Sequence, residues 1–113
     1  MENSDEERSV TFFSCPYLGG LAELNDERER HIEAEHDDLL PKRREYIAPT
    51  LDNPDRVQIS PGDPEARIFS RWYPELAKYV IVVVIIHPGP RNWIITAYIA
   101  QRPARGETEW QRN

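Results

Sequence analysis

An uninterrupted apolar run, YVIVVVIIH at residues 79–87, constrains the fold more than any other feature of the chain. Its β-branched side chains favour extended backbone, and its length suits one strand of a sheet. Because polar and apolar residues do not alternate in this run, both faces of the strand should be buried. The run is also too short to cross a bilayer, which requires roughly 20 apolar residues. The chain is therefore predicted to be globular, with this strand in the middle of a sheet.

Three other segments of the second half resemble strands. They are RVQIS (56–60), ARIFSRWY (66–73) and WIITAYIAQ (93–101), and the turn sequences PGDP and PGPRN separate them from their neighbours. Consecutive strands joined by tight turns usually pair with each other in antiparallel order. The second half of the chain therefore predicts a four-stranded antiparallel meander.

Two helices are expected before this meander. Asn25 is a good N-cap, and the acidic residues after it favour a helix that ends between His36 and Leu40. A second helix is expected over residues 42–51, although Pro49 interrupts it. Further upstream, VTFFSC (10–15) is expected to form a short strand and LAEL (21–24) a brief extended segment. The expected fold is α+β, with N-terminal helices packed on one face of the four-stranded sheet.

The length of 113 residues predicts a single domain spanning residues 1–113. Residues 1–8 and 103–113 are expected to be loosely ordered ends. The start of the chain is acidic and polar, unlike a secretory signal, which predicts a cytoplasmic protein. The single cysteine, Cys15, has no partner for an internal disulfide and is interpreted as a half-buried strand residue.

The charge is distributed unevenly along the chain. The net charge is −6, but residues 1–65 contain 7 basic and 17 acidic residues, whereas residues 66–113 contain 7 basic and 3 acidic residues. Binding of nucleic acid depends on Lys and Arg near phosphates. The asymmetry therefore indicates either a polyanion-binding face in the second half or an acidic helical face that favours solubility.

The segment HIEAEH at residues 31–36 contains two histidines five positions apart. On a helix they are about 140° apart around the axis, so they do not readily share a metal ion. His31 and Glu35 do share a helical face, and this pair suits acid–base chemistry or forms an ordinary solvated pair. His36 has a simpler interpretation as a cation near the helix C-terminus.

Alternation along the strands also groups polar side chains. Thr96 and Tyr98 should point to the same face of their strand, and Arg67 and Arg71 should share a face with two aromatic residues. Such a face suits a phosphate chain with bases stacked beside it, and it is equally typical of a solvated sheet.

The linked patterns LNDERERHIEAEHDDLL, IAPTLDNPDRV, RIFSRWY, KYVIVVVI and WIITAYIAQ, at about residues 20–102, resemble a known group of nucleases. This group is the phage-associated branch of the barnase, EndoU, colicin E5/D and RelE-like superfamily. The resemblance implies a RelE- or barnase-like fold and ribonuclease activity, often toxin-like, that needs neither metal nor cofactor. It also implies RNA as a partner and allows an antitoxin-like protein inhibitor.

By this resemblance His31 is the proton-transfer group, Arg71 the phosphate clamp, and Thr96 or Tyr98 a hydroxyl that contacts the phosphate or the 2′-hydroxyl. The second proton-transfer residue stays open among Glu35, His36 and Tyr98. The weaker substrate-binding candidates are Arg67, Lys78, Glu35 and His36. Two alternatives to an enzyme remain, namely a catalytically inactive module that binds RNA or protein, and an interaction protein that forms a homodimer.

Overall fold

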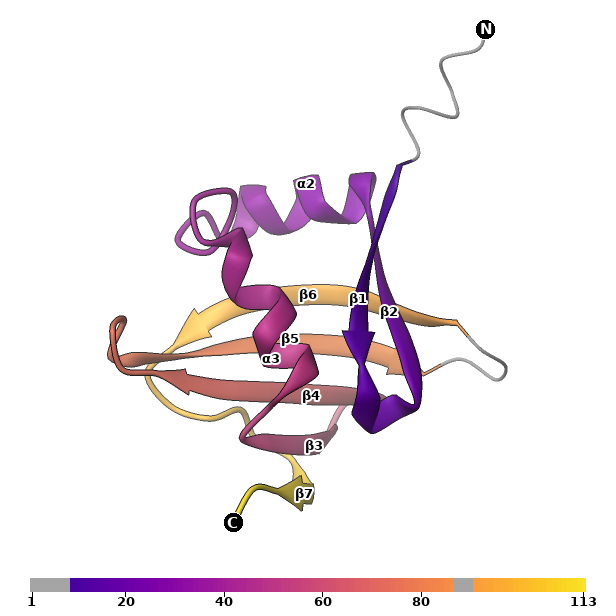
Figure 1. Cartoon of the computed structure of the whole chain (residues 1–113), viewed down its shortest axis with the longest axis vertical. Coiled ribbons are helices and arrows are strands. Elements are labelled where there is room, and N and C mark those ends of the chain that lie inside the picture. The colour runs from indigo at the N-terminus through magenta and orange to yellow at the C-terminus, as the bar shows by residue number, and fades with distance from the viewer. Residues whose placement is uncertain (1–8, 87–90) are drawn as a thin grey trace, which may run out of the picture.

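The computed structural model describes residues 9–86 and 91–113 and shows an α+β fold (Figure 1). Two α-helices accompany one seven-stranded sheet of mixed, mostly antiparallel strands. The elements in chain order are β1 (Val10–Cys15), η1 (Pro16–Leu18), β2 (Gly20–Asn25), α2 (Asp26–Glu35), η2 (Arg44–Tyr46), α3 (Ile47–Asp52), β3 (Arg56–Ser60), β4 (Asp63–Tyr73), β5 (Lys78–Ile86), β6 (Asn92–Ala100) and β7 (Glu107–Gln111). The end 1–8 and most of the PGPRN turn lie outside the described residues.

The predicted meander is present, because β3, β4, β5 and β6 pair in consecutive antiparallel order. The prediction of a four-stranded sheet is wrong, however, since the strand order is β1-β2-β6-β5-β4-β3-β7. The β1–β2 hairpin joins by a parallel pairing of Glu23 with Trp93. Arg91 strengthens this junction through an ion pair with Glu23 at 2.9 Å. At the other edge β7 pairs with β3, so part of the C-terminal end that was expected to be loosely ordered is a strand.

The helices lie between β2 and β3, which corrects the prediction that they are N-terminal. As predicted, α2 begins after Asn25, whose side chain accepts a hydrogen bond from the backbone N–H of Arg28 at 2.7 Å. Pro49 belongs to the first turn of α3, where a backbone N–H would have no helical partner, so proline costs no hydrogen bond. Among the described helices, none is long and apolar enough to span a membrane.

The main core lies between the sheet and α3. Phe69, Val80 and Val82 are fully buried on this side of β4 and β5, and Ile47 and Leu51 of α3 are fully buried with them in the same cluster. The β1–β2 hairpin closes the rest of this side, as Figure 1 shows. We call this side of the sheet the helix-covered face.

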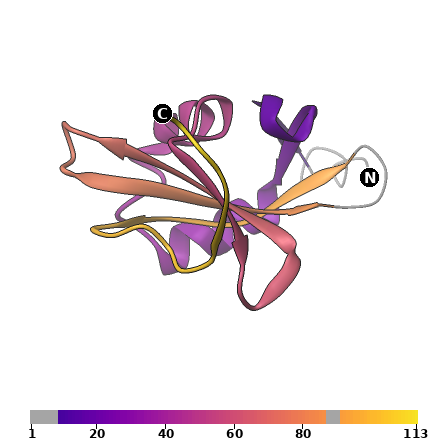
Figure 2. The same ribbon diagram turned by 90° about the horizontal axis from the view of Figure 1, so that it is seen from below.

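The opposite side, which we call the second face, has a smaller apolar cluster. Ile68, Ile81 and Val83 are buried there, and the segment 101–106 crosses this face and packs against them through Ala104. The side-chain amide of Gln58 holds this segment by donating to the carbonyls of Ala104 and Gly106, at 2.7 and 3.0 Å. In Figure 2, α3 and the turn of the β1–β2 hairpin lie on one side of the sheet, and the yellow segment after β6 begins on the other.

Gly106 marks the end of this crossing segment. Its φ is +139°, and a Cβ built there would lie 2.3 Å from the backbone carbonyl oxygen of Ile59. Only glycine fits this close approach, because any side chain would collide with backbone that is fixed in the sheet. The end of the crossing segment therefore lies directly against the backbone of β3, at the residue before β7 begins.

Candidate functional site

The structure brings together one imidazole and one phenol from the predicted set. His36 follows the last residue of α2, and its ring centroid lies 5.5 Å from that of Tyr98 on β6, with the planes inclined by 33°. His36 is four positions after Ile32, the one described residue of α2 that is buried, so both point towards the sheet. The core packing of Ile32 therefore positions the imidazole beside β6.

Tyr98 and Thr96 lie on the second face, as strand alternation predicted. Their Cα partners on β5 are Ile81 and Val83, which belong to the second-face cluster. Burial raises the pKa of the Tyr98 hydroxyl above its ordinary value of 10. Tyr98 therefore stays protonated at neutral pH, where it can donate a hydrogen bond but cannot serve as a base.

His31 and Glu35 are exposed on α2. Neither side chain makes a hydrogen bond or an ion pair with another residue that the structure describes, and the sequence-predicted pairing between them is not formed. Both side chains are accessible to a ligand, and their assignment as proton-transfer groups stays a prediction.

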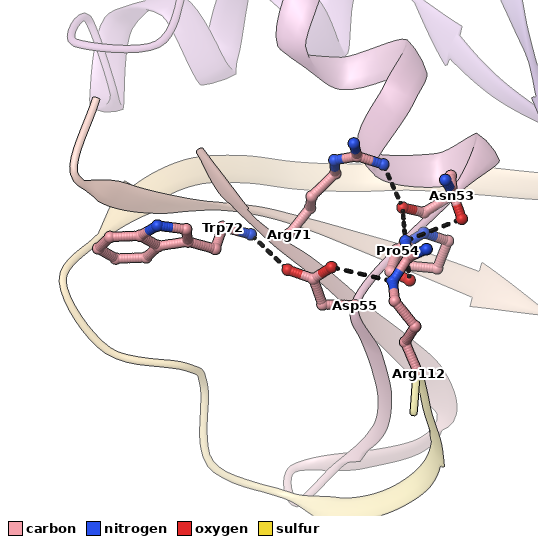
Figure 3. A network of polar contacts seen from close by, with 6 residues as sticks. All are labelled: Asn53, Pro54, Asp55, Arg71, Trp72 and Arg112. Atoms are coloured by element: carbon pink, nitrogen blue, oxygen red, sulfur yellow. Dashed lines mark hydrogen bonds and ion pairs between the residues drawn. The ribbon is translucent and has the colours of Figure 1, made fainter. Parts of the chain in front are cut away.

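Arg71 lies on the helix-covered face, because its partner on β5 is the core residue Val80. Its guanidinium donates to the backbone carbonyl of Asn53 at 2.7 Å and lies over the ring of Tyr73 (Figure 3). Arg112 donates to the same carbonyl at 2.8 Å, and its guanidinium also pairs with Asp55 at 3.3 Å. Arg71 thus belongs to a polar network that ties the turn before β3 to β4 and to the C-terminal end.

Arg67 is also bonded within the protein. Its Nε donates to the carboxylate of Glu109 on β7 at 2.8 Å, and the hydroxyl of Tyr17 donates to the same oxygen at 2.6 Å. Burial, together with the bond to Glu109, raises the pKa of Tyr17 to about 12. Hydrogen bonds from Arg67, the larger cause, and from Tyr17 lower the pKa of Glu109 below its ordinary value. This triad connects η1, β4 and β7.

We expect Glu109→Gln to lower the free energy of unfolding at pH 7 by about 1 kcal/mol, because Arg67 loses a charged partner. The folded-state pKa of Glu109 is depressed, so its contribution is present above the unfolded pKa and is lost as the pH falls through the folded pKa. The difference between wild type and variant should shrink below about pH 5, which urea unfolding at several pH values measures. Glu107→Gln, an exposed residue of the same strand, is the control, and an equal effect of both substitutions contradicts this role.

Lys78 lines a cavity of about 90 Å³ together with Asp38, Arg43, Leu76 and Ile99. Ile99 packs against the main core, so this small cavity opens on the helix-covered side. Lys78 is therefore separated from Thr96 and Tyr98 by the sheet.

The predicted residues consequently do not form one site. Arg67, Arg71 and Lys78 lie on the helix-covered face, whereas Thr96 and Tyr98 lie on the second face with His36 at its β6 edge. The aromatic residues that share the arginine face, Phe69 and Tyr73, are buried and cannot stack on bases. The residues that a ligand could reach together are therefore on the second face.

Comparison with family models, curated proteins and solved structures gave no match. The nuclease resemblance thus rests on the short sequence patterns alone.

The second face also carries residues that the sequence analysis did not select. Trp72 of β4 is 41% exposed, and its ring meets that of Tyr79 on β5 edge to face, with centroids 5.0 Å apart. Arg56 of β3 lies one strand further along and lines a hollow of about 200 Å³. A large aromatic residue at an outward position of a strand was the signal that could have identified this region.

Acidic side chains are numerous, but they do not converge on a metal site. Among residues 9–86 and 91–113 no group of three or more His, Cys, Asp or Glu side chains is placed to hold a metal ion.

Proposed function

We propose that the protein is a ribonuclease that cleaves single-stranded RNA on its second face, at the β6 edge. The observation that carries the proposal is the contact of His36 with Tyr98, a half-buried imidazole beside a half-buried, protonated hydroxyl. The nuclease resemblance supports the same reaction class. His36 takes the proton-transfer role for which His31 was the sequence-based candidate.

In the proposed reaction the imidazole of His36 accepts the proton of the RNA 2′-hydroxyl. The resulting oxygen attacks the adjacent phosphorus, and the bond from phosphorus to the 5′-oxygen breaks, which leaves a 2′,3′-cyclic phosphate. Tyr98 donates a hydrogen bond to a nonbridging oxygen, where negative charge accumulates, and Thr96 offers a second hydroxyl on the same face. Glu35, the last residue of α2, is the candidate for protonating the 5′-oxygen.

The test is incubation of the purified protein with labelled single-stranded RNA in excess EDTA. We expect fragments that carry 2′,3′-cyclic phosphate ends, because none of the proposed groups needs a metal ion. Intact RNA at high protein concentration contradicts the proposal.

A second candidate function is RNA binding without cleavage. The observation that favours it is that both arginines predicted to bind phosphate, Arg67 and Arg71, already donate to groups of the protein on the other face. A phosphate near Tyr98 would then lack their charge in the transition state. Retention of intact RNA that weakens with increasing salt distinguishes this function from cleavage.

A further inference from the structure

We infer that Trp72, Tyr79 and Arg56 form a second nucleotide-binding subsite on the second face, in which a base stacks on Trp72 and a phosphate binds Arg56. This inference rests on the proposed function for the identity of the ligand as RNA. It adds a subsite that is distant from the cleaved phosphate.

The first observation is an exposed aromatic surface. Trp72 is 41% exposed although it belongs to a central strand of the sheet. Its edge-to-face contact with Tyr79, at 5.0 Å and 70°, fixes the indole ring while one side stays accessible. Exposed rings held in this way bind bases of any sequence, because every base has a π-face.

The second observation is an unpaired cation in a hollow that Tyr79, the ring partner of Trp72, also lines. The hollow of about 200 Å³ is lined by Asp55, Arg56, Ser70, Tyr79, Gln111 and Arg112. Within this set Arg112 already pairs with Asp55, whose other oxygen accepts the backbone N–H of Trp72 at 2.7 Å. The side chain of Arg56 makes no hydrogen bond or ion pair with any other residue in the described part of the chain. Its charge is therefore available to an anion, and a guanidinium suits phosphate.

The third observation is the position of this hollow relative to the candidate catalytic residues. Tyr98, Ile81, Ser70 and Arg56 are successive Cα partners across β6, β5, β4 and β3. Three inter-strand spacings separate the two ends of this row, about 14 Å. A short piece of single-stranded RNA can span this distance, so one strand can contact His36 and Arg56 at once.

The crossing segment 101–106 adds positive charge to the same face. Arg102 and Arg105 are exposed on it, while Ala104 packs against the second-face cluster. The second face therefore has guanidinium groups that can follow an RNA backbone although the whole chain carries a net charge of −6.

The experiment compares Trp72→Ala with Trp110→Ala in the full chain. Trp110 is 39% exposed and contacts Tyr17 on the helix-covered side, which makes it a matched control. The substrates are a dinucleotide and an oligonucleotide extended by a few residues in either direction. We expect Trp72→Ala to raise KM for one extended substrate by about 10-fold, the effect of losing one base stack, and to leave the dinucleotide unchanged. Trp110→Ala should change neither substrate.

A parallel measurement uses Arg56→Gln and fluorescence anisotropy of labelled single-stranded RNA. Loss of one phosphate contact should weaken RNA binding. It should also reduce the slope of the logarithm of the binding constant against the logarithm of the salt concentration by about 1. If wild type cleaves no RNA, the proposed function fails, yet weaker RNA binding by Trp72→Ala than by Trp110→Ala still supports the subsite. Equal behaviour of the two tryptophan variants towards the extended RNA overturns the subsite, whether or not cleavage occurs.

Discussion

His36→Ala should reduce kcat/KM for cleavage of single-stranded RNA by about 10²- to 10⁴-fold. The imidazole of His36 is the ring that the structure places against Tyr98, and its removal leaves the 2′-hydroxyl without the proposed base. The loss should appear mainly in kcat, because the ring acts on the proton that moves during the reaction. Single-turnover cleavage of a labelled oligonucleotide in EDTA measures the effect.

His31→Ala is the matched control for this prediction, because the two histidines belong to the same HIEAEH segment. His31 is exposed, and its side chain has no hydrogen bond or ion pair with another described residue. A small loss in His31→Ala together with a large loss in His36→Ala supports the assignment. The reverse result restores His31 as the proton-transfer group, and equal small losses exclude both as the base.

The strands that depend on local signals could be predicted from the sequence. The apolar run around Val82 fixed the central strand, and the capping residue Asn25 fixed the start of α2 within the chain. The segment VTFFSC forms β1 as predicted, but the joining of the β1–β2 hairpin to the sheet and the strand β7 depend on contacts between distant segments. The pairing of Glu23 with Trp93 joins residues that neither periodicity nor a turn sequence connects, and β7 is exposed along its whole length, so it has no apolar pattern.

The candidate site was less predictable than the fold for a physical reason. Alternation correctly placed Thr96 and Tyr98 on one face, but it does not reveal which face of the next strand the helices cover. Arg71 looked available in the sequence because its acceptor is a backbone carbonyl, that of Asn53, which has no side-chain signature. Trp72 was overlooked because a tryptophan in a strand is usually part of a core.

Phe69→Ala should lower the free energy of unfolding by about 3–5 kcal/mol. Phe69 is fully buried on the helix-covered face and meets the ring of Tyr17 edge to face at 6.0 Å between centroids. Truncation removes a large apolar surface and leaves a cavity that the fully buried residues around it on the sheet and α3 cannot fill. Urea unfolding followed by fluorescence measures this loss. An unchanged slope of the free energy of unfolding against urea concentration shows that the unfolding transition itself is preserved.

Trp72→Ala provides the control, since Trp72 belongs to the same strand and points to the second face. It is partly exposed, so its removal should cost about 1 kcal/mol or less. The two substitutions should also differ in their effect on RNA cleavage. Trp72→Ala should raise KM for an extended RNA, as argued above for the base-stacking subsite. Phe69→Ala should leave RNA cleavage nearly unchanged at temperatures where the protein stays folded, because Tyr98 lies across the sheet from Phe69 and His36 lies at the β6 edge. A cost below about 1 kcal/mol for Phe69→Ala contradicts its place in the main core. A loss of RNA cleavage in the folded Phe69→Ala protein would instead mean that the helix-covered face, with Arg67 and Arg71, takes part in the reaction.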